Sequence, residues 1–282
     1  MERLYAEQVA HGLPILIAFL MAGLSPVAAQ TDLDAFMARV LAQRDQNWRK
    51  LQQFILEERE TLQVTGPGGA RLFGRQRDYQ WFTREGIFVR SPLRADGVRV
   101  DEDERIDEED DWIRRERRRN REEPRFVSAA YFLRFRFDPG HYALAGREQL
   151  DGREVLRVEY YPTKMFLEGR LRPNREVRRR DPQVQEKLNK GSLVTLWIDP
   201  AAHQILQYEF ENVDLEFLPA RFLMRMEAMR ATMRMTQPFT GVWLPRSIAI
   251  RVEGTVATGV VHARYDTEYY DYKQADVTAE IK

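Results

Sequence analysis

Alternation of apolar and polar residues is the main signal along this chain, and it is clearest in the last third. Within residues 204–212 the apolar side chains occupy every second position, namely Leu206, Tyr208 and Phe210. Residues 247–253 repeat the alternation with Ile248, Ile250 and Val252. A period of two is typical of a strand with one buried face. Residues 192–282 are therefore predicted to form antiparallel strands that share an apolar face.

A methionine-rich segment lies between these two strands. Its apolar residues Met229, Ala231, Met233 and Met235 alternate with Arg230, Thr232 and Arg234. Some of the same residues also fall at helical spacing with Phe222 and Met226, so two structures compete here. The pattern predicts a short helix that ends near Glu227 and a strand from Ala228, with a turn at residues 237–241.

The segment after residue 30 has the three- and four-residue spacing of an amphipathic helix. Thr31 is a candidate N-cap with Asp34 three residues later. The apolar stripe consists of Leu33, Phe36, Met37, Val40, Leu41, Trp48 and Leu51. This helix is expected to pack on a sheet.

Strand patterns resume after this helix. Residues 55–64 and 71–83 flank a Gly-Pro-Gly-Gly turn, residues 87–89 follow, and a further turn is expected at residues 92–97. Residues 142–148 and 154–161 flank Asp151 and Gly152, a strong hairpin signal because both turn positions need a positive φ. The pattern predicts a meander of hairpins.

Two charged segments interrupt this meander. Residues 101–123 begin with acidic residues and end with arginines, which favours a helix whose charges suit its dipole. This helix is either a solvated surface element or a basic patch for lipid head groups or a protein partner. A second, apolar helix is expected at 126–137. The arginine-rich residues 162–190 resemble an insertion at the rim of the sheet, either a lid or a disordered segment.

The N-terminus has the features of a signal peptide. An apolar run at 13–24 precedes Val27 and Ala29, which occupy the small-residue positions that signal peptidase reads. Cleavage is expected after Ala29, although an uncleaved anchor is the competing interpretation; the run is shorter than the roughly 20 residues of a spanning helix. The chain has no cysteine, so it forms no disulfide and carries no lipobox cysteine. We expect a periplasmic protein that is not integral to the membrane after processing.

Composition and the absence of catalytic motifs exclude several classes of function. The chain has 282 residues, and its 44 Lys and Arg balance its 44 Asp and Glu, so no overall field favours nucleic acid. Outside the signal peptide, the histidines are the widely separated His141, His203 and His262, and no Gly-x-Ser-x-Gly elbow or Gly-rich phosphate loop is present. The sequence predicts a protein that is not an enzyme and has no cofactor or metal. A pair of glycosidase carboxylates is the enzymatic alternative that remains open.

Several short motifs resemble one family. They are Asp151-Gly152-Arg153-Glu154, Leu196-Trp197-Ile198-Asp199-Pro200, Gly241-Val242-Trp243-Leu244-Pro245 and Tyr269-Tyr270-Asp271-Tyr272. Together with the signal peptide and the first helix, they resemble the periplasmic outer-membrane lipoprotein-sorting (LolA-type) carriers and their wider superfamily. The resemblance implies an α+β fold that is mainly antiparallel: a curved half-barrel of about ten or eleven strands with helices over its concave face. It also implies a single domain over residues 30–282.

The function implied by this resemblance is the transport of an acyl chain. Members of the superfamily carry acyl chains or bind lipidated peptides in the concave apolar space. The candidate lining residues in this chain are Leu206, Tyr208, Phe210, Met229, Met233 and Met235, because flexible methionines suit variable acyl chains. The expected partner is a lipid or the acyl chain of a lipoprotein. The alternative is an envelope sensor or adaptor that binds a lipidated ligand and signals to a protein partner.

Overall fold

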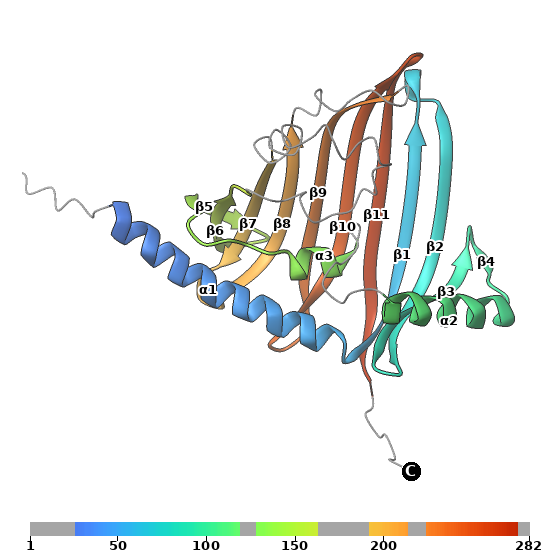
Figure 1. Ribbon diagram of the computed structural model, residues 1–282, viewed down its shortest axis with the longest axis horizontal. Helices are drawn as coiled ribbons and strands as arrows, with labels where there is room; N and C mark the ends of the chain where they lie inside the picture. Colours follow the sequence, from blue (N-terminus) through green and yellow to red (C-terminus); the bar gives the residue numbers. More distant parts are fainter. Residues whose placement is uncertain (1–25, 119–127, 163–191, 214–223, 276–282) are drawn as a thin grey trace, which may run out of the picture.

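The structure is a computed structural model that describes residues 26–118, 128–162, 192–213 and 224–275 (Figure 1). The described residues form one open sheet of eleven antiparallel strands, in the order β4-β3-β2-β1-β11-β10-β9-β8-β7-β6-β5. Neighbours in this order are also neighbours along the chain, except where β1 pairs with the final strand, β11. The first strands therefore extend the sheet beyond the last one.

The strands are long and are joined by turns. Their bounds are β1 (Phe54–Thr65), β2 (Arg71–Arg84), β3 (Ile87–Ala95), β4 (Val98–Arg99), β5 (Tyr142–Leu150), β6 (Arg153–Tyr160), β7 (Ser192–Asp199), β8 (Gln204–Val213), β9 (Met224–Phe239), β10 (Val242–Val256) and β11 (Gly259–Gln274). A single 3-10 turn, η1 (Pro67–Gly69), joins β1 to β2. The β5–β6 hairpin is as predicted: Asp151 and Gly152 have φ values of 50° and 78°, the positive angles that a tight hairpin turn of this type requires.

Among the described residues, three helices accompany the sheet: α1 (Pro26–Leu51), α2 (Glu102–Arg118) and α3 (Ala129–Arg134). Figure 1 shows α1 crossing the lower ends of β7 to β10, with α3 beside it and α2 next to β3 and β4. Phe132 of α3 packs on Tyr208 and Phe210 of β8, with ring centroids 6.2 and 5.0 Å apart. The fold class is therefore confirmed: the protein is α+β and mainly antiparallel, with helices over one face of the sheet.

The core lies between α1, α3 and the middle strands. Register brings Tyr208 opposite Met233, and Met233 opposite Ile248, so one face of β8, β9 and β10 is continuously apolar. All three side chains are at most 1% exposed. Asn47 of α1 is also buried, and its Nδ2 donates a hydrogen bond of 2.7 Å to Gln204 Oε1 on β8. That bond fixes the helix against the sheet.

Several predicted boundaries were wrong. α1 begins at Pro26, so Thr31 lies inside the helix and is not its N-cap. β9 begins at Met224, so the helix expected to end near Glu227 is absent from the described residues 224–227. The long β10 explains this difference, because Val256 and Gly254 pair with Met224 and Met226 and hold them in the sheet. Pairing between strands outweighs a local helical pattern.

The other departures lie around α2 and α3. The expected turn at 92–97 begins later, because β3 continues through Pro92 to Ala95 beside an irregularity in its pairing with β2, a position where a strand tolerates proline. The apolar helix expected at 126–137 is only the short α3. The charged helix expected at 101–123 ends, within the described residues, at Arg118, and residues 163–190 of the expected insertion lie outside them. α2 is not fully solvated, since Glu109 is 3% exposed.

Candidate functional site

The six predicted lining residues lie mainly in the core. Tyr208, Phe210 and Met233 are at most 1% exposed, Leu206 and Met235 are each 7% exposed, and Met229 is partly buried. Tyr208 and Phe210 are covered by Phe132 of α3. None of the six lines the pocket described next. A role for them in ligand contact therefore stays a prediction.

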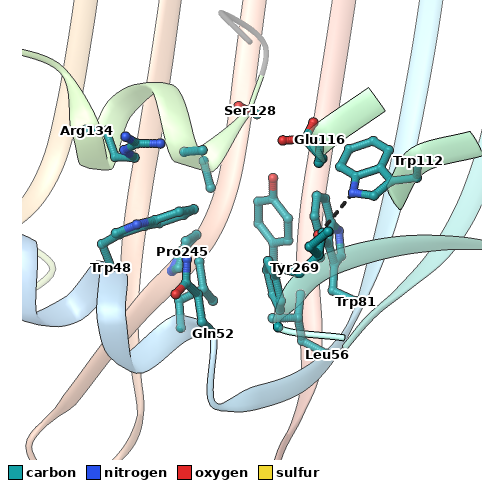
Figure 2. Close-up of a pocket in the computed structure, with 16 residues that line it drawn as sticks. Trp48, Gln52, Leu56, Trp81, Trp112, Glu116, Ser128, Arg134, Pro245 and Tyr269 are labelled. Carbon is teal, nitrogen blue, oxygen red and sulfur yellow. Dashed lines mark hydrogen bonds between the residues drawn. The ribbon is translucent and has the colours of Figure 1, made fainter. Parts of the chain in front are cut away.

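An aromatic pocket of about 410 Å³ opens where the three helices meet the sheet (Figure 2). It lies between the end of α1, the start of β1, the β2–β3 hairpin, the last turns of α2 and the start of α3. Five aromatic side chains line it: Trp48, Trp81, Phe88, Trp112 and Tyr269. Smaller apolar residues complete the wall, namely Leu51, Leu56, Ile87, Ala129, Ala130 and Pro245, and the polar lining is Gln52, Glu116, Ser128 and Arg134.

The aromatic wall is ordered by its own contacts. Trp81 stacks on Phe88 with ring centroids 4.9 Å apart, and Trp112 meets Trp81 edge to face at 5.5 Å. Trp112 Nε1 donates a hydrogen bond of 3.1 Å to the backbone oxygen of Phe88 (Figure 2). Trp81, Phe88 and Trp112 are each held by a neighbour, so ordering this part of the wall costs a ligand little free energy. The pocket is preformed.

A buried ionic network lies directly behind Trp81. Trp81 Nε1 donates a hydrogen bond of 2.7 Å to Glu58 Oε2, and the Arg90 guanidinium bridges Glu58 and Glu60. Arg75 pairs with Glu60 at 2.9 Å. Arg90 also lies over the ring of Tyr79, 3.4 Å from its centroid. The network anchors one pocket wall to β1, β2 and β3.

Two pKa shifts follow from this burial. Burial alone would raise the pKa of Glu60, but the charge of Arg90 and hydrogen bonds from Arg90, Tyr265 and Arg75 lower it below its ordinary value. Burial first, and then the charge of Glu58, raises the pKa of Tyr269 well above its ordinary value. Glu60 is therefore an anion at neutral pH, and Tyr269 presents a neutral hydroxyl group near the pocket.

His203 and His262 lie apart from each other and from the aromatic pocket. His203 accepts a hydrogen bond of 3.0 Å from Arg39 and packs on Phe36, whereas His262 lies 3.6 Å from Glu253 on the strands β10 and β11. In the part of the chain that the structure describes, no group of three or more metal-ligating side chains is placed to hold a metal ion. No helix in that part is long and apolar enough to cross a membrane.

Comparison with known proteins adds only distant likenesses. No family model matches this chain, and no curated protein matches it. A DUF1329 family protein from Desulfovibrio piger is similar over 90% of this chain and 95% of its own, at 14% identity and a TM-score of 0.38. The MucA/MucB complex of Pseudomonas aeruginosa contains a chain similar over 86% of this chain and 94% of its own, at 12% identity and a TM-score of 0.20. Likenesses this weak carry no argument about function.

The sequence patterns missed the pocket because its lining residues come from eight different helices and strands. One compositional signal was available: three of the chain's five tryptophans, Trp48, Trp81 and Trp112, line this single space. Trp48 and Trp81 each lie near the C-terminal end of their helix or strand, whereas Trp112 lies inside α2. Their convergence is visible only once the strands are paired.

Proposed function

We propose that this protein is an exported binding protein that holds an acyl chain of a lipid or lipoprotein in the aromatic pocket and catalyses no reaction. The single observation that carries the proposal is the pocket itself. Its volume of about 410 Å³ lies within the range of roughly 300–1,000 Å³ typical of sites for small ligands. Its walls are mainly aromatic and aliphatic, as a site for a hydrocarbon chain requires.

The chemistry of the pocket supports binding rather than catalysis. The Tyr269 hydroxyl is neutral at neutral pH, and burial raises its pKa further above the ordinary value. Behind the aromatic wall, the carboxylates of Glu58 and Glu60 are engaged by Arg90, and Glu58 also accepts a hydrogen bond from the indole of Trp81. A catalytic acid or base must be free to exchange its proton at the operating pH, and groups tied into this network are poorly suited to that task.

Export to the periplasm follows from the apolar run at 13–24 and the small residues before Gln30. A protein in this compartment meets lipids and lipoproteins in transit between membranes, which gives the pocket a ligand of fitting chemistry. Expression of the full chain with a periplasmic fractionation and N-terminal sequencing tests this part. A mature N-terminus at Gln30 in the periplasmic fraction is expected, whereas an uncleaved chain in the membrane fraction contradicts it.

The adaptor function remains the second candidate, because the same pocket would serve a sensor that reports a bound lipid. Its partner surface is expected on the arginines between residues 170 and 180 of the arginine-rich segment, which lie outside the described residues. Deletion of that segment separates the two functions. Loss of partner capture with unchanged lipid binding supports the adaptor function. Retention of both properties contradicts the adaptor function and supports the carrier function.

Quenching of tryptophan fluorescence by a brominated acyl chain tests the proposed pocket. The three pocket tryptophans are expected to be quenched saturably by dodecanoic acid that carries bromine along its chain. Ala130→Phe places a ring in the pocket and should abolish the quenching. Ala143→Phe is the matched control, because Ala143 is exposed on the edge strand β5. Equal quenching in the two variants would place the chain elsewhere.

A further inference from the structure

Tyr269 places a buried hydroxyl group against the aromatic pocket. The residue lies on β11 opposite Glu58 of β1, and it is only 8% exposed although it lines the pocket. Figure 2 shows its hydroxyl group pointing toward the side of the pocket where Glu116 and Ser128 lie. A polar group therefore faces a space whose walls are mainly aromatic and aliphatic.

This hydroxyl group differs from those of two other tyrosines on β11. The Tyr265 hydroxyl donates a hydrogen bond of 3.0 Å to Glu60 Oε2. The Tyr272 hydroxyl donates one to the backbone oxygen of Pro245. The Tyr269 hydroxyl has no hydrogen bond to any other described residue. A buried donor without an acceptor is unfavourable, so Tyr269 is suited to a partner that enters the pocket.

The surroundings of Tyr269 favour an uncharged partner. Burial first, and then the charge of Glu58, raises the pKa of the hydroxyl, whereas Arg90 acts more weakly in the opposite sense. The hydroxyl therefore keeps its proton and can donate it to a hydrogen bond. The same two factors disfavour a ligand carboxylate at this point, because burial and a neighbouring carboxylate both destabilise an anion. A carbonyl oxygen accepts a hydrogen bond without adding a charge.

The other polar groups of the pocket are engaged or exposed. The indole nitrogens of Trp81 and Trp112 already donate to protein acceptors. The remaining polar lining residues either make other interactions or are exposed to solvent: Glu116, Ser128 and Arg134 in the first case, and Gln52 in the second. Tyr269 thus combines burial with a donor that no described residue engages. A plain hydrocarbon chain would leave this donor unpaired once water leaves the pocket.

We propose that the Tyr269 hydroxyl donates a hydrogen bond to the carbonyl oxygen of an ester or amide in the ligand, so that the pocket prefers esterified or amidated acyl chains to free fatty acids. The inference rests on the proposed function and names its ligand class. Methylene groups of the chain contact the aromatic wall, while the carbonyl is held at Tyr269. An acyl ester belongs to a glycerolipid and an acyl amide to an N-acylated protein, and both present the same carbonyl acceptor.

The test compares ligands that share one chain and differ in the carbonyl. Sucrose monododecanoate carries an ester, N-dodecanoyl-N-methylglucamine an amide, dodecyl maltoside an ether, and dodecanoic acid a free carboxylate. Each is titrated as a monomer into the mature protein by isothermal calorimetry. Because the head groups differ, the quantity compared is the change that each ligand shows between the native protein and Tyr269→Phe.

Tyr269→Phe should weaken binding of the ester and the amide by about tenfold, as expected for one buried hydrogen bond. The affinities for the maltoside and for dodecanoic acid should stay nearly unchanged. A larger loss for the ester than for the amide assigns the site to a glycerolipid, and the reverse assigns it to an N-acylated protein; both results support the proposal.

Infrared spectroscopy observes the hydrogen bond itself. The stretching band of an isotope-labelled ester carbonyl should lie at a lower frequency in the native protein than in Tyr269→Phe, because a hydrogen bond weakens the carbonyl bond. A purely structural role of Tyr269 would not produce this difference. Tyr265→Phe is the matched control, because it removes a hydroxyl from the same strand outside the pocket lining. It should change neither the carbonyl band nor the affinity for the ester.

The outcomes for the two proposals differ. An ester affinity and a carbonyl band that are unchanged in Tyr269→Phe overturn the hydrogen bond and leave the pocket intact. A loss for dodecanoic acid as large as the loss for the ester overturns the preference for esters and amides. An equal loss in Tyr265→Phe also overturns the proposal, because the effect then comes from the fold. Failure of every ligand to bind the native protein, the maltoside included, overturns the proposed function itself.

Discussion

The length of the bound chain should be readable from the volume of the pocket. A methylene group is similar in size to a water molecule, whose share of liquid volume is about 30 Å³. A pocket of about 410 Å³ then accommodates on the order of a dozen carbons. Each buried methylene contributes about 0.8 kcal/mol, or roughly fourfold in affinity. Affinity should rise by this factor per carbon and flatten near twelve carbons.

Calorimetric titration of alkyl maltosides with chains of increasing length, each as a monomer, measures this dependence. The head group is neutral and the same in every ligand, so differences in affinity report the length of the chain alone. Ala130→Phe fills part of the space, and the plateau should then occur at a shorter chain. An affinity that keeps rising well beyond a dozen carbons, or that is independent of length, would refute the assignment of the chain to this pocket. Ala143→Phe should leave the plateau in place.

Three further predictions concern stability, each measured as the free energy of unfolding in urea. Phe132→Ala should cost about 3–5 kcal/mol, because Phe132 is fully buried on Tyr208 and Phe210, whereas the exposed Leu144→Ala should change stability by less than about 0.5 kcal/mol. The pKa of folded Glu60 lies below its ordinary value despite burial, chiefly because of Arg90, so its stabilising contribution should be present above the ordinary pKa of a glutamate and lost as the pH falls through the lower folded-state pKa. Glu60→Gln should weaken this acid dependence, and an unchanged slope would contradict the network. Gly152→Ala should cost about 1 kcal/mol, because φ is 78° there, and an unchanged stability would argue against the turn.

Local patterns predicted the elements that depend on neighbouring residues. The Asp151–Gly152 turn was confirmed because its geometry is set by two residues that tolerate a positive φ. The apolar alternation of β8 was confirmed as well, since Tyr208 and Phe210 share the buried face. The open antiparallel sheet with helices over one face followed from these elements and from the family resemblance. Local chemistry was sufficient in each case.

Features that depend on distant pairing were predicted less well. The segment at 224–227 has helical spacing, yet it is a strand because β10 extends far enough to pair with it. Glu109 lies in a charged helix but is buried, because Ser91 and Arg105 hydrogen-bond to it and Arg84 pairs with it. The charge pattern alone favoured a solvated helix. Tertiary partners decided both outcomes.

The candidate site, too, could not be predicted from local sequence patterns. A search for lining residues by strand alternation selected Tyr208, Phe210 and Met233, which fill the core. The pocket instead forms between elements that are distant in the sequence, where Trp112 packs on Trp81 and Trp48 lines the opposite side. Alternation identifies the buried face of a strand, but it cannot distinguish a face covered by a helix from a face that borders a cavity. That distinction requires the positions of α1, α2 and α3.

Native mass spectrometry of the mature protein, purified from a periplasm without detergent, tests the central claim most directly. The account predicts a co-purifying amphiphile at near one-to-one stoichiometry, released by organic extraction and absent from Ala130→Phe. The extracted molecule would also identify the head group of the ligand. A clean mass of the protein alone, unchanged after incubation with single-chain lipids, would contradict the claim that the aromatic pocket is a lipid site.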